Sequence, residues 1–189
     1  MFHTIMMIDQ NILLWIQDTV RMPALTTFFT FITRMGDAAA VWIVLSVCLL
    51  ASKRTRIIGI MALCSLGFSF IIDNVLLKNL IGRVRPYEVV QGLQCLIEVQ
   101  TDFSFPSGHT GSSFAVAVVL LTKLPKKYGV PALMLAVLIG FSRLYLGVHY
   151  PTDVLCGALI GTMIAILVCC TGNLIVEWYA KRRGIIHDN

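Results

Sequence analysis

Long apolar runs separated by short polar segments recur along the whole chain, a pattern typical of helices that cross a membrane. A spanning helix needs about 20 mostly apolar residues. Four runs predict such helices, at 57–77, 108–121, 130–146 and 154–176. A fifth run, 41–50, is short, and we expect it to extend backwards through 28–32, with Arg34 and Asp37 in the helix or at a break in it. The predicted fold class is an all-α, polytopic membrane bundle with five transmembrane helices.

The N-terminal segment has a different pattern, in which apolar and polar side chains alternate at helical spacing. The apolar positions are Ile5, Ile8, Ile12, Trp15 and Ile16. This spacing fits an amphipathic helix that lies in the membrane interface. A sixth spanning helix is the alternative for the same segment.

The composition narrows the class of protein. Of the 189 residues, 57% are apolar and 13% are charged, whereas a soluble domain needs more polar surface. We therefore expect one integral membrane domain over 1–189. The net charge of +5 does not indicate nucleic acid binding, because the basic residues stand in short clusters between apolar runs. Five of the six cysteines lie inside apolar runs, where small buried side chains are the usual interpretation.

The basic clusters predict the orientation of the chain in the membrane. They are Lys53, Arg54 and Arg56; Lys123, Lys126 and Lys127; and Lys181, Arg182 and Arg183. With alternating crossings, all three clusters fall on one face, which the positive-inside rule assigns to the cytoplasm. We therefore expect a multi-pass protein of the plasma (inner) membrane with a cytoplasmic C-terminus. Residues 78–107 and 144–151 would then lie together on the outer face.

The predicted outer face concentrates the ionisable groups that suit phosphoryl transfer. A phosphoryl group in transfer needs fixed positive charge around its oxygens. Arg85 and Arg143 offer planar, bidentate donors, and Lys78 offers a compact charge. The amides near Ser107 and Gly108, at a helix N-terminus, add oriented donors for an anion. Singly, each residue also fits an interfacial anchor or a helix cap, but ionisable groups gathered at membrane depth are usually functional.

Two histidines complete this chemistry. His109 and His149 can supply a nucleophile and a general acid. Asp153, one helical turn after His149, can hold an imidazole in the correct tautomer. The sequence has no carboxylate cluster suited to a metal ion, so we expect metal-independent chemistry without a cofactor.

Three short motifs occur in order. Lys78 is followed after six residues by Arg85-Pro86; next comes Pro106-Ser107-Gly108-His109; and Ser142-Arg143 stands five residues before His149, with three more before Asp153. In order and internal spacing, these motifs resemble the three-part signature of the type 2 phosphatidic acid phosphatase (PAP2) superfamily.

The resemblance implies a role for each motif residue. His149 would attack phosphorus and form a phosphohistidine, with Asp153 orienting it. His109 would protonate the leaving oxygen and later activate water. The phosphate-binding residues would be Lys78, Arg85, Ser107, Gly108 and Arg143. Membrane members of the family are commonly six-helix bundles.

The expected partners are a lipid phosphate substrate and membrane lipids, with no nucleic acid and no predicted oligomeric state. Undecaprenyl diphosphate is the favoured substrate. Phosphatidylglycerophosphate, phosphatidic acid and diacylglycerol pyrophosphate are close alternatives. A transporter would spread polar residues through the membrane depth and repeat its halves, and an inactive scaffold would have lost a motif residue. The sequence has neither feature.

Further polar residues lie near the motifs. Arg83 either contacts a second phosphate or faces the lipid head groups. Asp73 either orients a site cation or makes a local hydrogen bond in its helix. Asp102 is expected to be a solvated loop residue, within a segment (87–105) that helps form the entrance to the site.

Overall fold

A bundle of helices forms most of the computed structural model, which describes residues 2–182 and contains no strand within them. The helices are α1 (Phe2–Trp15), α2 (Pro23–Met35), α3 (Ala40–Leu50), α4 (Arg56–Ser69), α5 (Lys78–Ile81), α6 (Pro86–Val89), α7 (Gly108–Lys123), α8 (Lys126–Tyr145) and α9 (Pro151–Arg182). Two π-helical segments, η1 (Ile16–Val20) and η3 (Phe70–Leu77), and a 3-10 turn, η2 (Asp37–Ala39), join some of them. The prediction of an all-α fold is confirmed for the described residues.

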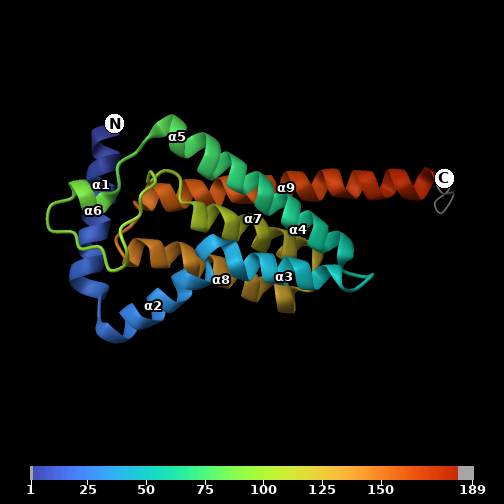
Figure 1. Cartoon of the computed structure of the whole chain (residues 1–189), viewed down its shortest axis with the longest axis horizontal. Helices are drawn as coiled ribbons and strands as arrows, with labels where there is room; N and C mark the ends of the chain where they lie inside the picture. The colour runs from blue at the N-terminus through green and yellow to red at the C-terminus, as the bar shows by residue number, and fades with distance from the viewer. Residues whose placement is uncertain (1, 183–189) are drawn as a thin grey trace.

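Helix α7 lies at the centre of the bundle, packed against α4, α8 and α9 (Figure 1). Its small residues allow this position. A Cβ atom on Gly161 of α9 would lie 2.2 Å from the carbonyl oxygen of Gly111, so the backbones of α7 and α9 are in direct contact. Small residues permit such close helix packing in membrane proteins. The first turns of α7 and α9 are thereby held together, and the amide of Ser107 donates a hydrogen bond to the carbonyl of Asp153 (3.1 Å).

Among the described residues, three helices are long and apolar enough to cross a membrane: Arg56–Val89, Lys126–Tyr145 and Pro151–Tyr179. The pair Pro23–Met35 and Asp37–Leu50, bent by 51°, makes a fourth if it counts as one span. The predicted count of five is therefore not confirmed. The difference is α7, whose 16 residues begin with the polar run Gly108 to Ser113. At 1.5 Å per residue it is about 24 Å long, shorter than the hydrocarbon core of about 30 Å.

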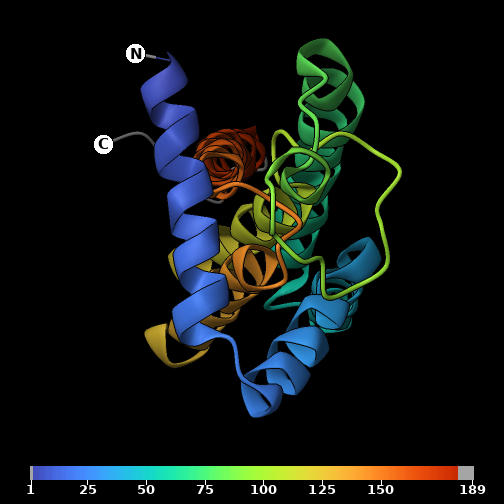
Figure 2. The same ribbon diagram turned by 90° about the vertical axis from the view of Figure 1, so that its left-hand side faces the viewer.

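Helix α1 runs across one end of the bundle, transverse to α9 (Figures 1 and 2). It has 14 residues and is not among the helices that are long enough to span. Leu13 and Asp9 of α1 are buried, whereas Ile8 and Trp15 are exposed. This arrangement agrees with an amphipathic helix at the interface and disfavours a sixth span.

The helix is interrupted by a sharp bend between α2 and α3. Ala38 and Ala39 adopt the left-handed backbone conformation, with φ of 48° and 55°. This conformation costs a non-glycine residue about 1–2 kcal/mol, so the surrounding contacts must favour it. Asp37 begins η2 at this break, which is one of the two predicted alternatives, while Arg34 remains within α2.

The predicted basic clusters gather at the end of the bundle opposite α1. The α3–α4 turn and the C-terminal part of α9 both lie there (Figure 1). Lys123, at the end of α7, donates a hydrogen bond to Asn173 in the same part of α9. Arg183 lies outside the described residues.

Candidate active site

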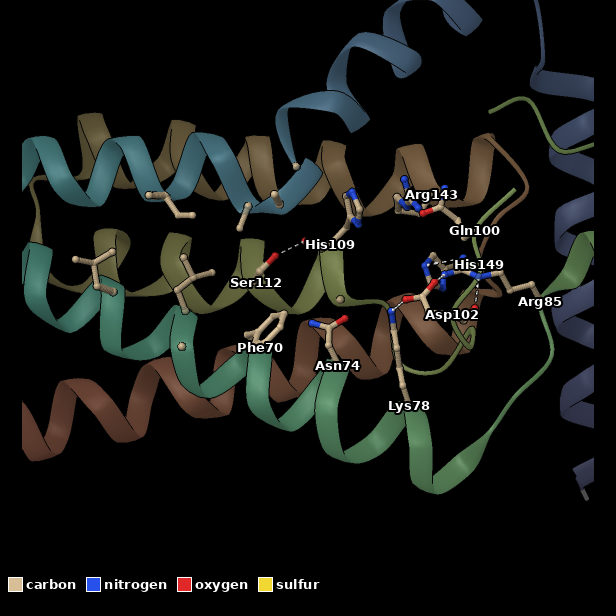
Figure 3. A pocket seen from close by; sticks show the side chains of 18 residues that line it. Phe70, Asn74, Lys78, Arg85, Gln100, Asp102, His109, Ser112, Arg143 and His149 are labelled. Carbon is tan, nitrogen blue, oxygen red and sulfur yellow. Dashed lines mark hydrogen bonds and ion pairs between the residues drawn. The ribbon is translucent and has the colours of Figure 1, made fainter. Parts of the chain in front are cut away.

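The predicted site residues meet at a cavity of about 590 Å³ near the α1 end of the bundle (Figure 3). Six of the eight line it: Lys78, Arg85, Gly108, His109, Arg143 and His149. They come from three segments that are far apart in the sequence, as the motif pattern predicted. In Figure 3 the labelled charged side chains lie toward one end of the cavity and side chains of carbon alone lie toward the other, and the apolar lining residues include Ile43, Leu63, Leu66 and Phe70. The cavity therefore joins a cationic end to an apolar end.

His149 lies in the turn between α8 and α9 and is almost fully buried. Gly147, with φ of 77°, ends α8 in the left-handed conformation that commonly terminates helices. The amide of Val148 then donates to the carbonyl of Arg143 (3.1 Å), so this turn brings Arg143 and His149 to the same cavity. Nε2 of His149 lies 3.4 Å from Nη1 of Arg85. Nε2 of His149 therefore lies at the cationic end of the cavity.

Asp153 stands behind His149. Its Oδ2 lies 3.5 Å from Nδ1 of His149, a close contact that does not meet the geometry of a hydrogen bond. The same oxygen accepts hydrogen bonds from Ser104 and from the amide of Tyr150 (2.9 Å). Burial, together with the charges of the site arginines, outweighs the nearby carboxylate and lowers the pKa of His149 to about 3. The imidazole is therefore neutral near pH 7.

Asp102 occupies the cationic end of the cavity. Its carboxylate accepts hydrogen bonds from Lys78 and from Nη2 of Arg85 (2.6 Å), and its carbonyl accepts one from Nε of Arg85 (2.9 Å). Burial raises the pKa of Asp102, but the hydrogen bonds and charges of Lys78 and Arg85 outweigh it and bring the pKa to about 2. Asp102 is an exposed loop residue, as expected, but the sequence did not predict that it binds Lys78 and Arg85, because these side chains are remote in sequence.

Arg143 is the third cation. Its Nη1 donates to Oγ1 of Thr33 (2.7 Å), and its buried Nε has no hydrogen-bond partner among the described residues. Arg143 is 1% exposed. An unpartnered donor at a buried position is costly, so this guanidinium is suited to an incoming anion.

His109, in the first turn of α7, contacts a residue that the motifs do not include. Its Nε2 lies 2.9 Å from Oδ1 of Asp37, at the break between α2 and α3. A Cβ atom on Gly36 would lie 2.9 Å from Cδ2 of His109, so glycine is required for this approach. In the sequence, the Gly36-Asp37 pair inside an otherwise apolar stretch was the available signal for this contact. That pair did not indicate His109 as the partner of Asp37.

Ser107 and Gly108 stand at the start of α7, and Ser107, like Asp153, is a predicted residue that does not line the cavity. Ser107 is fully buried, accepts a hydrogen bond from Thr110 (2.9 Å) and is not among the lining residues. Gly108 lines the cavity, where a Cβ atom would lie 2.5 Å from the side-chain oxygen of Asn74. Gln100 and Asp102 also line the cavity, so segment 87–105 does contribute to it.

Arg83 and Asp73, whose roles the sequence left open, each make defined contacts in the structure. Arg83 points inward and contacts Asp153 and Asp9, not a surface of head groups. Asp73 accepts a hydrogen bond from Ser69, one turn earlier in its helix (2.7 Å), which is the local alternative. Within residues 2–182, no group of three or more His, Cys, Asp or Glu side chains is arranged to hold a metal ion.

Comparison with known proteins identifies the family to which this chain belongs. The model of the PAP2 superfamily matches residues 55–176. The chain is 36% identical to an undecaprenyl-diphosphatase of Sulfolobus acidocaldarius, over 76% of this chain and 68% of that protein. It is 35% identical to phosphatidylglycerophosphatase B of Bacillus subtilis, over 79% and 76%.

A solved structure agrees with the sequence relatives. The crystal structure of a transmembrane PAP2-type phosphatidylglycerolphosphate phosphatase from Bacillus subtilis superposes with a TM-score of 0.75 at 30% identity. The match covers 91% of this chain and 88% of that one. The motifs, the helical fold and these relatives together show that this integral membrane protein belongs to the PAP2 superfamily and is a PAP2-type lipid phosphatase.

Proposed function

We propose that this enzyme hydrolyses a lipid diphosphate, with undecaprenyl diphosphate as the best candidate, through a phosphohistidine on His149. The observation that carries the proposal is the two-ended cavity, in which cations and His149 line one end and apolar side chains line the other. A lipid phosphate has the same division between an anionic head and an apolar tail.

Binding begins with the terminal phosphate at the cationic end. Lys78 and Arg85 exchange the carboxylate of Asp102 for the phosphate oxygens, and the unpartnered Nε of Arg143 gains an acceptor. The three cations offset the charge that spreads over the equatorial oxygens during transfer. The N-terminus of α7, at Gly108, adds its helix dipole to this field.

The first chemical step transfers the phosphoryl group to the enzyme. The lone pair of Nε2 on neutral His149 attacks phosphorus, so a P–N bond forms as the P–O bond to the lipid breaks. The proton on Nδ1 stays on the ring, where Asp153 stabilises the positive charge that develops. Protonated His109 gives its proton to the leaving oxygen, and the lipid product departs.

The second step returns the enzyme to its starting state. Neutral His109 takes a proton from a water molecule as the water oxygen attacks phosphorus, and the P–N bond to His149 breaks. Inorganic phosphate is released, and His109 is again protonated. Burial and the charge of Arg143 lower the pKa of His109, and Asp37, at 2.9 Å, opposes this shift and favours the charged form that the first step requires.

The apolar end of the cavity supports a lipid leaving group with a long tail. Its lining side chains belong to α3, α4 and η3, which face lipid on their outer sides, as the exposed Val44, Ile60 and Phe68 indicate. The relatives include both an undecaprenyl-diphosphatase and a phosphatidylglycerophosphatase. Their identities of 36% and 35% do not separate the two substrates, and we favour the prenyl diphosphate because a further relative, from Bacillus subtilis and 31% identical, is also named an undecaprenyl-diphosphatase.

We also propose that the active site faces away from the cytoplasm in the plasma (inner) membrane. The basic ends of the helices lie opposite the site, and basic loops remain on the cytoplasmic side. The C-terminus would then be cytoplasmic.

A phosphate-release assay with purified protein tests the proposal. The substrates are undecaprenyl diphosphate, phosphatidylglycerophosphate, phosphatidic acid and diacylglycerol pyrophosphate, each in the same detergent micelles. We expect the highest kcat/KM for undecaprenyl diphosphate and no turnover by His149→Ala. A higher kcat/KM for another lipid would replace the substrate, and full activity of His149→Ala would remove the nucleophile.

A further inference from the structure

Arg83 connects the carboxylate behind His149 to the N-terminal helix. Its Nη1 donates to Oδ1 of Asp153 (2.6 Å) and to Oγ1 of Thr152 (2.7 Å), and its Nη2 donates to Oδ2 of Asp9 (2.8 Å). The guanidinium lies 3.8 Å from the centre of the Tyr150 ring. Four contacts from one side chain hold it in a single orientation, which a mobile head-group ligand would not require.

Asp9 completes the connection from the side of α1. It is 1% exposed, and its carboxylate accepts hydrogen bonds from the amide (3.1 Å) and the hydroxyl (2.5 Å) of Thr152 in addition to Arg83. Thr152 is in the first turn of α9. Asp9 therefore satisfies a free amide at the N-terminus of α9, where a negative charge is favourable. A carboxylate is rarely buried so fully without such partners.

The two oxygens of Asp153 have separate tasks in this arrangement. Oδ2 faces His149 and also binds Ser104 and the amide of Tyr150, whereas Oδ1 is held by Arg83. Rotation of the carboxylate would break the Oδ1 contact. Because Arg83 is anchored by Asp9, the direction in which Asp153 points depends on α1.

We infer that Arg83 and Asp9 are positioning residues for Asp153, and that α1 is consequently a part of the catalytic site. Helix α1 lies outside residues 55–176, the span that the family model matches. The inference rests on the proposed role of the His149–Asp153 pair. It assigns Arg83 a role in catalysis without contact to the substrate, in place of binding a second phosphate.

The charge arrangement predicts the effect of each substitution. One guanidinium lies between two buried carboxylates, so Arg83→Gln leaves Asp9 and Asp153 without their shared cation and lets Asp153 turn. A misplacement of about 1 Å can cost about 100-fold in rate, and we expect kcat to fall between 10- and 100-fold. Arg83→Lys keeps the charge but not the two-ended fork, so it should recover part of that loss. Asp9→Asn should lower kcat about tenfold by releasing the far end of Arg83.

Steady-state kinetics on two substrates test the inference. We would measure kcat and KM for a lipid diphosphate and for the matching lipid monophosphate, using Asp18→Asn as control. Asp18 is an exposed carboxylate in η1, close to α1 in sequence, and does not line the cavity. Positioning predicts an equal fall in kcat on both substrates, with KM changed less than twofold. Binding of a second phosphate predicts a rise in KM on the diphosphate alone, and that result would overturn the inference.

A double-mutant comparison provides the second measurement. If Asp9 acts through Arg83, the Asp9→Asn/Arg83→Gln protein should be no slower than Arg83→Gln alone, whereas independent effects would multiply. Fully multiplied losses would refute the coupling. Wild-type turnover and the inactivity of His149→Ala test the proposed function separately. Thermal unfolding in detergent identifies any variant that fails to fold, in which case Arg83→Lys and Asp9→Asn still decide the matter.

Discussion

If Lys78 and Arg85 bind the substrate phosphate as proposed, Asp102 competes with the substrate for these two cations, and Asp102→Asn should tighten phosphate binding. Lys78 and Arg85 both donate hydrogen bonds to its carboxylate. A phosphate group must displace these contacts and then remain near the carboxylate. The amide of asparagine keeps the size of the side chain but removes its charge.

The size of the effect follows from the charge and its exposure. Two unit charges about 6 Å apart interact with about 3 kcal/mol at the effective dielectric near a protein surface. The Asp102 side chain is 50% exposed, so solvent and salt screen this repulsion. We reduce it to about 1 kcal/mol, which corresponds to about a fivefold change in a dissociation constant.

Inhibition by inorganic phosphate is the suitable assay, because phosphate needs the cations but not the apolar end of the cavity. We expect its inhibition constant to fall about fivefold in Asp102→Asn, with kcat changed less than twofold. Glu88→Gln, an exposed carboxylate on α6 that does not line the cavity, is the matched control. A rise in the inhibition constant would refute the reasoning, since it would mean that Asp102 chiefly holds Lys78 and Arg85 in place.

Three further outcomes are expected. Asp37→Asn should lower kcat about tenfold on lipid substrates, because it acts through His109. It should leave kcat on an activated aryl phosphate unchanged, because that leaving group needs no proton. An equal loss of kcat on both substrates would contradict this role. Activity should persist in excess EDTA, measured by phosphate release, and a strict need for added divalent metal would contradict it. Gly161→Ala should destabilise the fold by about 1–3 kcal/mol in thermal unfolding, because the added Cβ would meet the Gly111 backbone. Gly172→Ala is the control, since its added Cβ would meet only the flexible side chain of Met61.

The helical fold class could be predicted because apolar runs in a membrane leave the backbone no other way to satisfy its hydrogen bonds. The limits of individual spans were less predictable. Helix α7 is short and begins with a polar turn, yet it occupies the centre of the bundle. A break near Asp37 was one predicted alternative, but Ala38 and Ala39 are not glycines, so local propensity did not identify them as its left-handed positions.

The amino-acid sequence alone determined which residue types are present for phosphate chemistry, because the motifs keep Lys78, Arg85, His109, Arg143 and His149 at short, regular spacings. Within each motif, helix and turn geometry decides which side chains share a face. Local geometry therefore carried most of the candidate site.

Only the tertiary structure decided which acids face these bases. Asp37 is 72 residues from His109, Asp102 is 24 from Lys78, and Asp9 is 74 from Arg83. No spacing rule relates such pairs, since each depends on how separate helices pack. The sequence does not distinguish a solvated carboxylate from a buried one, because its burial and its hydrogen-bond partners depend on tertiary packing.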